Sequence, residues 1–330
     1  MRSQSISVVI PNYNGENLLP AILPPLYTAL TKANVPYEII ISDDCSTDQS
    51  LAFLSTHYPE IKILQNSTNS GFSVTANKGF YAAQYDYIFL LNSDVKLTDD
   101  YFMPLFKYFD EDKKTFGVMG RIIGWDDDEI QDGAKYPSFH GAKIKTTGNY
   151  VSLQPGTNDR LYSMYLSGAN AFLDKQKLLQ LGGFNELFSP FYVEDYELSL
   201  RAWRLGYTCY YDHFAVCRHQ VSKSIKAKNK KKYINTIYYR NKLFLHYIHL
   251  SGADLLLWKL QLIGETIFSF FTGKFYFFTS LRLFFKNIKG AKEAKDKIAA
   301  LAIETQKLYS VKQVAQIILN SLNQEKIKRF

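Results

Sequence analysis

Acidic residues stand where a predicted buried strand ends, in a pattern that could support chemistry. The stretch FLLNSDVKLTDDYF holds Asp94, Asp99 and Asp100 directly after a run of large apolar side chains. Asp99 and Asp100 follow Thr98 at a predicted helix start, where a Thr cap and acidic first-turn residues stabilise a helix. Asp94 ends the strand itself, where a carboxylate must reach solvent or bind a positive group. Asp94 is therefore the candidate for chemistry.

A second acidic pair and a histidine lie further along the chain. The segment VEDYELSLR places Glu194 and Asp195 at a predicted helix start. Acids there can simply complement the helix dipole, with Glu197 and Arg201 forming an i,i+4 ion pair. Carboxylates are also common general acids and bases. His219 follows a predicted strand, where a lone histidine is typically a surface or core residue.

The acidic segment DDCSTD follows another apolar run. Asp43 and Asp44 close a predicted strand, where a carboxylate can accept a hydrogen bond from a ligand N–H. Ser46 and Asp48 could instead cap the helix that follows, and both roles can hold at once. The run DDDE at 126–129 is predicted to be a solvated loop.

The composition describes a globular chain with two electrostatically different parts. Of its residues, 46% are hydrophobic and 21% charged, which is typical of a globular protein, and 330 residues suffice for one large α/β domain with an appendage or for two ordinary domains. Residues 1–220 carry 18 Lys and Arg against 25 Asp and Glu, whereas residues 221–330 carry 21 against 6. The two parts are expected to meet different partners. Cys45, Cys209 and Cys217 match neither a disulfide framework nor a zinc site, which favours reduced, cytosolic thiols.

Three early segments predict the elements that must position these side chains. ISVVIPNYNG (6–15), YEIIISDDCSTDQS (37–50) and YDYIFLLNSD (85–94) each run from an apolar strand into a polar turn. Apolar strands that alternate with helical patterns imply a mostly parallel sheet with helices on both faces. The fold class is therefore α/β, and a ligand is expected at the carboxyl ends of the strands.

The rest of the chain divides into a polar middle and a basic end. Residues 115–165 are predicted to be short strands and loops, and residues 223–330 a basic, aromatic-rich helical extension of a domain at 1–222. No uncharged apolar run approaches the length of a spanning helix, and the N-terminal strand is too short for a signal-peptide core.

The order of the motifs resembles that of a known family. VVIPNYNG, IIISDDCSTD, NSGFSVTANKG, FLLNSDV, LSGANAFL, GGFNELF, YVEDYELSLRAWRLGY and CRHQVSKS resemble the successive motifs of family 2 glycosyltransferases over residues 6 to about 224. These are inverting enzymes with the GT-A fold, a Rossmann-like sheet. The resemblance is greatest to the bacterial rhamnosyltransferase-like, cell-surface polysaccharide branch.

The resemblance implies a nucleotide site and a donor-sugar site. Pro11, Tyr13, Asp43 and Asp44 are expected at the base and ribose, where a carboxylate can accept the imide N–H of uracil or thymine. The same resemblance places the remaining donor-binding residues at Gly71, Asn77, Asn92, Gly168, Ala169 and Asn170.

The resemblance also implies a divalent cation and a base. NSDV matches the family's DxD motif, with Asn92 in the first place and Asp94 in the last. Asp94 and His219 are then the protein ligands of Mg or Mn, which offsets the charge of the leaving diphosphate. Asp195 is the expected general base, and Glu194 the second choice.

The implied reaction moves a sugar from a UDP- or dTDP-sugar to a saccharide hydroxyl, on a polyprenyl-linked acceptor. The basic, aromatic extension is expected either to contact the inner face of the cell membrane or to self-associate. The acidic front part excludes nucleic acid as the expected partner. The alternatives are a non-catalytic sugar-nucleotide-binding or scaffold protein and a nucleotidyltransferase, although the loop after the first strand lacks the basic residues of the latter.

Overall fold

The computed structural model describes residues 4–152, 161–220, 230–322 and 327–329. Its helices are α1 (Leu19–Ala33), α2 (Ser50–His57), α3 (Phe72–Ala82), α4 (Lys107–Glu111), α5 (Lys175–Leu181), the 3₁₀ helix η1 (Glu186–Phe188), α6 (Glu194–Arg204), α8 (Lys231–His249), α9 (Gly252–Phe271), α10 (Phe275–Lys286), α11 (Ile288–Thr305) and α12 (Val311–Asn320). Its strands are β1 (Ile6–Asn12), β2 (Tyr37–Asp43), β3 (Lys62–Gln65), β4 (Tyr87–Leu91), β5 (Val95–Leu97), β6 (Thr115–Gly124), β7 (Ile130–Asp132), β8 (Ala134–His140), β9 (Lys143–Ser152), β10 (Leu161–Tyr162), β11 (Asn170–Asp174), β12 (Thr208–His219) and β13 (Ile327–Arg329).

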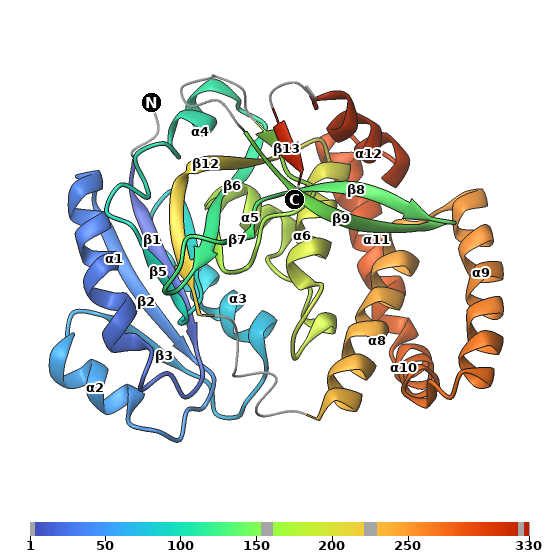
Figure 1. Ribbon diagram of the computed structural model, residues 1–330, viewed down its shortest axis with the longest axis horizontal. Helices are drawn as coiled ribbons and strands as arrows, with labels where there is room; N and C mark the ends of the chain where they lie inside the picture. Colours follow the sequence, from blue (N-terminus) through green and yellow to red (C-terminus); the bar gives the residue numbers. More distant parts are fainter. Residues whose placement is uncertain (1–3, 153–160, 221–229, 323–326, 330) are drawn as a thin grey trace.

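A mixed sheet forms the centre of the molecule (Figure 1). Its strand order is β10-β12-β6-β11-β4-β1-β2-β3, with β5 paired to β12 and β7 to β6. The pairs among β3, β2, β1 and β4 are parallel, whereas β11 runs antiparallel between β4 and β6. The carboxyl ends of β1, β2 and β4 therefore share one edge, as the α/β prediction requires.

Helices cover both faces of this sheet. Successive apolar residues of a strand point to opposite faces, so Val8 and Ile10 pack with α1 whereas Val9 packs with α3. The same division occurs in the neighbouring strands: Ile39, Ile41, Phe89 and Leu91 join the first cluster, and Ile40, Ile88 and Leu90 the second. The predicted fold class is confirmed.

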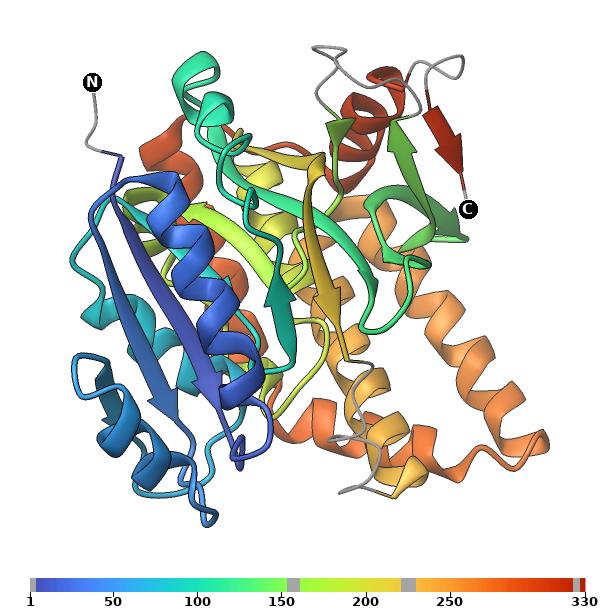
Figure 2. The same ribbon diagram turned by 60° about the vertical axis from the view of Figure 1, so that its left-hand side comes forward.

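The C-terminal helices pack on the sheet domain rather than apart from it (Figures 1 and 2). Phe244 of α8, Trp258 of α9 and Ile298 of α11 belong to one core cluster with Tyr196 and Trp203 of α6. The predicted helical character of this region is confirmed. The predicted boundary at 222 and 223 lies outside the described residues. Among the described helices, none combines the length and the hydrophobicity needed to span a bilayer.

Two local expectations were wrong. The segment predicted as short strands and loops contains the ten-residue strands β6 and β9, and β6 lies between β11 and β12 within the sheet. No α-helix begins at Asp99: residues 99–106 form turns, and the Thr98 hydroxyl donates to Val216 O instead of capping a helix. Pro104 cannot donate a backbone hydrogen bond, which fits the late start of α4 at Lys107.

Candidate active site

The ends of β1 and β2 are joined by side-chain hydrogen bonds. Asn12 Nδ2 donates to Asp43 Oδ1 at 2.8 Å, and the backbone N of Ser46 donates to Asp43 Oδ2 at 2.9 Å. Asp43 is fully buried, so its carboxylate shapes the turn after β2. Asp48 accepts from the backbone N of Ser50, the first residue of α2, at 3.0 Å. The capping alternative therefore holds for Asp48, whereas the Ser46 hydroxyl binds Asp43.

Asp44 orders a second loop beside the first. Its Oδ1 accepts from Ser70 N at 2.7 Å and from Asn66 Nδ2 at 3.0 Å, and its Oδ2 accepts from Gly71 N at 2.9 Å. Only 5% of Asp44 is exposed, whereas Tyr13 is 41% exposed on the neighbouring loop. Pro11 is half-buried at the end of β1. The two carboxylates thus position the loops, and Tyr13 offers the accessible surface.

Gly71 marks a close approach between two loops. Its φ is +89°, and a Cβ built there would lie 2.6 Å from Pro190 Cα. Phe72 N also donates to Pro190 O at 2.9 Å. A side chain at position 71 would push away the loop that leads into α6, so the structure explains this glycine by packing.

The turn after β4 brings Asp94 to His219. Asp94 Oδ2 lies 3.6 Å from His219 Nε2, and Gln220 N donates to Asp94 O at 3.0 Å. His219 Nδ1 lies 3.1 Å from Gln131 Oε1, which fixes the ring orientation. Asp94 Oδ1 is buried and has no hydrogen-bond partner among the described residues. Buried polar atoms are nearly always satisfied, so this oxygen is an available ligand.

Asp94 and His219 together fit a divalent cation whose coordination shell is completed by a bound ligand. The pair offers one carboxylate and one imidazole, both of which bind Mn or Mg. Within the described ranges, no cluster of three or more His, Cys, Asp or Glu could enclose a metal ion. Asn92 lies two residues before Asp94 and is half-buried in the same turn. Diphosphate oxygens and water would therefore have to supply the remaining ligands.

The second acidic pair, Glu194 and Asp195, begins α6 as predicted. Hydrogen bonds connect it to the turn that holds Asp94. Gly168 N donates to Asp195 Oδ2 at 3.3 Å, while Ala169 O accepts from Asn92 N at 3.1 Å. Burial raises the pKa of Asp195, against hydrogen bonds from Gly168 and Tyr196 that lower it. Burial, followed by the charge of Asp195, raises the pKa of Glu194. Two adjacent residues, 168 and 169, thus link the Asp94 turn to the acidic pair.

The predicted ion pair of α6 is present and extends further. Arg201 Nη2 lies 2.8 Å from Glu197 Oε2, and His249 of α8 lies 3.2 Å from Glu197 Oε1. Glu194 differs from Glu197, because its Oε2 is buried and has no hydrogen-bond partner in the described part of the chain. Glu197 is satisfied by its buried ion pairs, whereas one carboxylate oxygen of Glu194 is not.

The loop before α6 is held by α8. Asn241 Nδ2 donates to the carbonyls of Phe188 at 2.6 Å, Phe191 at 3.0 Å and Tyr192 at 2.8 Å. Tyr192 and Val193 have φ of 74° and 75°, a rare conformation for such side chains. A residue of the basic extension therefore fixes the approach to the acidic pair.

Two predicted ligand residues are committed elsewhere. Asn77 is 3% exposed, its Nδ2 donates to Phe184 O at 2.9 Å, and its Oδ1 accepts from Phe184 N at 2.8 Å. Asn170 is fully buried and donates to Gly120 O at 3.1 Å. Asn77 is thereby engaged by a loop and Asn170 Nδ2 by a strand, whereas the buried Asn170 Oδ1 has no hydrogen-bond partner among the described residues.

Asp132, at the end of β7, is a site residue that the sequence reasoning missed. It pairs with Lys135, and burial raises its pKa against that pairing. The charges of His219 and Asp132 interact, and so do those of Asp132 and Asp195. The charge of Asp132 therefore acts on both His219 and Asp195. A short polar strand before a glycine, IQDG, was the only signal, and DDDE beside it is indeed an exposed loop.

Comparison with known proteins identifies a family. Residues 7–167 match the family model described as glycosyl transferase family 2. These residues belong to glycosyltransferase family 2. The motif resemblance is confirmed.

Relatives of known sequence match over short stretches. An uncharacterized glycosyltransferase of Haemophilus influenzae is 33% identical over 99 residues, 30% of this chain and 31% of the relative. An undecaprenyl-phosphate 4-deoxy-4-formamido-L-arabinose transferase of Pectobacterium atrosepticum is 31% identical over 121 residues, 35% of this chain and 37% of the relative. The chain thus spans about a third of the length of each of these relatives.

Solved structures share the fold. The mannosyltransferase PcManGT of Pyrobaculum calidifontis, solved with GDP-Man and Mn2+, has a TM-score of 0.52 at 15% identity over 97% of this chain and 86% of its own. TarS 1-349 of S. aureus, solved with UDP-GlcNAc, has a TM-score of 0.52 at 17% identity over 76% of this chain and 68% of its own. These structural similarities establish the GT-A fold of the chain.

Proposed function

We propose that this family 2 chain is an inverting glycosyltransferase that moves a sugar from a nucleotide diphosphate donor to a saccharide hydroxyl. The observation that carries the proposal is the pair of hydrogen bonds at 168 and 169, which joins the Asp94 turn to Asp195. A reaction centre needs the leaving-group site and the base at one place.

Asp94 and His219 would hold Mg or Mn against the donor diphosphate. When bound, the cation offsets the charge that develops on the departing diphosphate. The unpartnered Oδ1 of Asp94 and the imidazole oriented by Gln131 support this assignment. Asn92 would contact the same phosphates from the first place of the motif.

Asp195 would accept the proton of the attacking hydroxyl. The acceptor oxygen bonds to the anomeric carbon as the bond from that carbon to the diphosphate oxygen breaks, so one base suffices and configuration inverts. A raised pKa brings a carboxylate closer to the operating pH, which suits a general base. Gly168 and Ala169 would border the donor sugar, where the small side chains leave room.

The nucleotide would lie over the ends of β1 and β2. Tyr13 is the accessible side chain there, and Pro11, Asp43, Asp44 and Gly71 shape the loops around it. We propose a UDP or dTDP donor. This choice rests on the motif resemblance, because Asp43 and Asp44 are buried and already accept hydrogen bonds from the loops.

The acceptor would be a lipid-linked glycan of cell-surface polysaccharide synthesis. The Pectobacterium relative is named for transfer to undecaprenyl phosphate, which supports an acceptor on a polyprenyl carrier. We therefore place the protein in the cytoplasm, on the inner face of the cell membrane.

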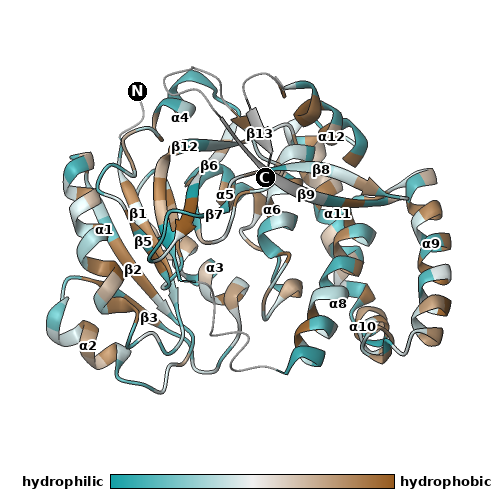
Figure 3. Ribbon diagram, in the orientation of Figure 1, coloured by the Kyte–Doolittle hydropathy of each residue, from teal (hydrophilic) through white to brown (hydrophobic). Residues whose placement is uncertain are grey.

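Helix α9 supports the membrane contact. Leu256, Leu260, Ile263, Ile267 and Phe270 recur at helical spacing and are each more than half exposed. Figure 3 shows hydrophobic residues along this helix, at the margin of the molecule away from α1 and α2. An apolar stripe near exposed lysines, such as Lys259 and Lys274, suits an anionic bilayer surface. The alternative occupant of this face is a second copy of the chain.

The test combines donor binding with turnover. Thermal shift with UDP-, dTDP- and GDP-sugars, with and without Mn, should give a metal-dependent rise for one nucleotide class. Asp94→Ala should abolish the rise, whereas Asp99→Ala, an exposed aspartate five residues away, should keep it. Release of free nucleotide in the presence of acceptor would exclude the scaffold alternative, and release of inorganic pyrophosphate from a nucleoside triphosphate would favour a nucleotidyltransferase.

A further inference from the structure

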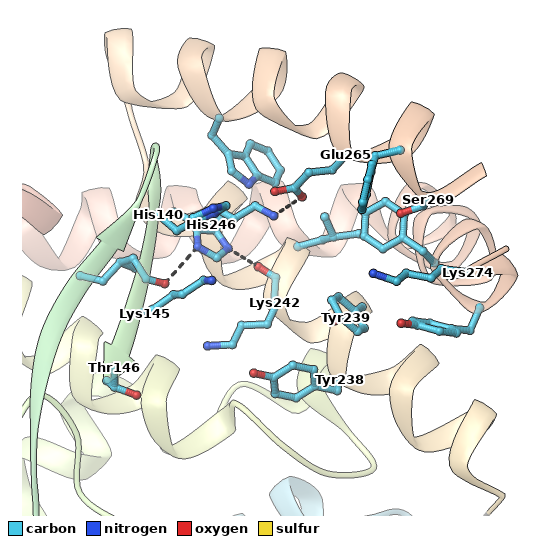
Figure 4. A pocket seen from close by; sticks show the side chains of 17 residues that line it. His140, Lys145, Thr146, Tyr238, Tyr239, Lys242, His246, Glu265, Ser269 and Lys274 are labelled. Atoms are coloured by element: carbon cyan, nitrogen blue, oxygen red, sulfur yellow. Dashed lines mark hydrogen bonds and ion pairs between the residues drawn. The ribbon is translucent and has the colours of Figure 1, made fainter. Parts of the chain in front are cut away.

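A cavity of about 510 Å³ lies between the β8–β9 hairpin and helices α8, α9 and α10 (Figure 4). Its walls are of two kinds. Lys143, Lys145, Lys242 and Lys274 line it with ammonium groups, and Trp258, Phe268, Phe277 and Leu243 line it with apolar surface. Neither the nucleotide nor the metal assignment above uses this cavity.

The cations of the cavity outnumber its anions. Lys143 pairs with Glu265, the one acid among the lining residues. In the described part of the chain, Lys145, Lys242 and Lys274 make neither a hydrogen bond nor an ion pair through their ammonium groups. Figure 4 shows Lys145 from β9 and Lys242 from α8 extending toward each other, with Tyr238 next to Lys242. An excess of partly enclosed positive charge is the property of an anion site.

The electrostatics of Lys242 agree with this geometry. Burial lowers its pKa to about 8, the charge of Asp195 opposes that shift, and the charges of Lys145 and Lys143 add to it. Lys143 and Lys145 thus lie close enough to Lys242 for their charges to repel it. A bound anion would offset this repulsion and raise the pKa of Lys242 again.

Lys242 also connects the cavity to the proposed base. Its ammonium lies 4.7 Å from the ring centre of Tyr196, the residue after Asp195. On the other side, the apolar wall continues into α9, whose outer stripe is the proposed membrane contact. A ligand in this cavity would therefore have its anionic part toward Asp195 and an apolar part toward α9.

We propose that this cavity binds the phosphate or pyrophosphate group that links the acceptor sugar to its apolar carrier. The inference deepens the proposed function, because it rests on a lipid-linked acceptor. Lys145, Lys242 and Lys274 contact the phosphate oxygens, and the wall of Trp258, Phe268 and Phe277 contacts the first part of the carrier chain. The site thereby holds the acceptor sugar on the Asp195 side of the cavity.

Calorimetric titration with inorganic pyrophosphate and geranyl pyrophosphate tests the site directly. EDTA in all titrations weakens binding of either probe at the nucleotide site, since that site depends on a metal. Geranyl pyrophosphate should bind at least about tenfold more tightly than inorganic pyrophosphate, because its apolar chain is buried. Equal affinity would overturn the assignment to a lipid carrier, and no binding of either probe would overturn the site.

Charge variants identify the binding residues. Lys145→Glu and Lys274→Glu should each weaken binding of geranyl pyrophosphate about tenfold or more, because each replaces a cation at the phosphate with an anion. Both side chains are exposed, so neither substitution should disturb the fold. Lys242→Met should weaken the binding likewise. Lys259→Glu, the same charge change at an exposed position of α9 outside the cavity, should leave affinity unchanged. Unchanged affinity in Lys145→Glu and Lys274→Glu would contradict the proposal.

A further control separates this inference from the proposed function. Asp94→Asn should lose metal-dependent nucleotide binding and keep the affinity for geranyl pyrophosphate. If sugar transfer fails with all donors while lysine-dependent binding persists, the proposed function is wrong and the anion site stands. If transfer occurs and the lysine variants keep the KM for a lipid-linked acceptor, the anion site is wrong and the enzyme stands.

Discussion

His219 and Asp94 come from two strand ends that are distant in the sequence, yet the imidazole Nε2 lies 3.6 Å from the carboxylate Oδ2. Strand β12 positions the histidine and the turn after β4 positions the aspartate. His219→Ala should raise the Mn concentration needed for half-maximal turnover at least about tenfold, because a protein ligand is lost. Mn titration of donor turnover measures this, with His57→Ala at the exposed end of α2 as the control.

Gln131 should matter through His219 alone. Its Oε1 lies 3.1 Å from His219 Nδ1, so Gln131→Leu should weaken apparent Mn affinity about tenfold, with a smaller effect on turnover at saturating Mn. The same Mn titration measures both values. A loss of turnover that excess Mn cannot restore would argue against this positioning role.

Substitutions of Asp195 and Glu194 should lower kcat to different extents. Asp195→Asn should lower kcat by about 10²- to 10⁴-fold, the usual contribution of a general base, while donor-induced thermal shift persists. Glu194→Gln should cost less than Asp195→Asn. The reverse order would move the proton-accepting role to Glu194.

Glu194 should give the fold a pH dependence of known sign. Its folded-state pKa is raised to about 8, chiefly by burial and then by Asp195, so the folded state holds a proton that the unfolded state releases near pH 4.5. Its contribution to stability is therefore complete below about pH 4.5 and is lost as pH rises through about 8. Urea unfolding measures the free energy of unfolding at pH 6 and at pH 9. The decrease between these two pH values should be about 1–3 kcal/mol smaller in Glu194→Gln than in the wild type.

Gly71 should tolerate no side chain. Gly71→Ala combines a φ of +89° with a Cβ 2.6 Å from Pro190 Cα, so it should destabilise the fold by about 2 kcal/mol or more and lower kcat by displacing the loop before α6. Gly264→Ala is the matched control, because a Cβ there meets no atom within 4 Å inside a helix, and it should stabilise by up to about 1 kcal/mol. Chemical unfolding compares the two.

The outer stripe of α9 should bind anionic vesicles. Leu260 and Ile263 are 57% and 59% exposed, so Leu260→Glu with Ile263→Glu should abolish vesicle co-sedimentation with little change in stability. Ile303→Glu changes an 81% exposed isoleucine on α11 and should leave vesicle co-sedimentation unchanged. If the stripe instead joins two copies, light scattering would show a dimer in wild type that the double variant loses.

The predictable parts of this molecule were those set by local pattern. Alternating apolar runs located β1, β2 and β4, because strands buried on both faces need apolar residues on both, and the ion pair of Glu197 with Arg201 followed from helical spacing. The contact of His219 with Asp94 needed the family resemblance, because no local pattern encodes pairing between distant strand ends.

The parts that escaped prediction depend on contacts between distant segments. Asp132 gains its place from the pairing of β7 with β6, and its flanking sequence gives no sign of its neighbours. Asn77 was expected to meet a ligand, but its amide is used on a loop far along the chain. The basic cavity needs β9, α8 and α9 together, and charge composition alone cannot place lysines around one space.

The contacts of Asn241 limit how freely the basic extension can be replaced. A single amide in the basic extension holds three carbonyls of the loop that introduces Asp195. Exchanging the extension with that of a relative would therefore displace the loop before α6. Under the proposed function, Asn241 couples the acceptor-binding extension to the position of Asp195.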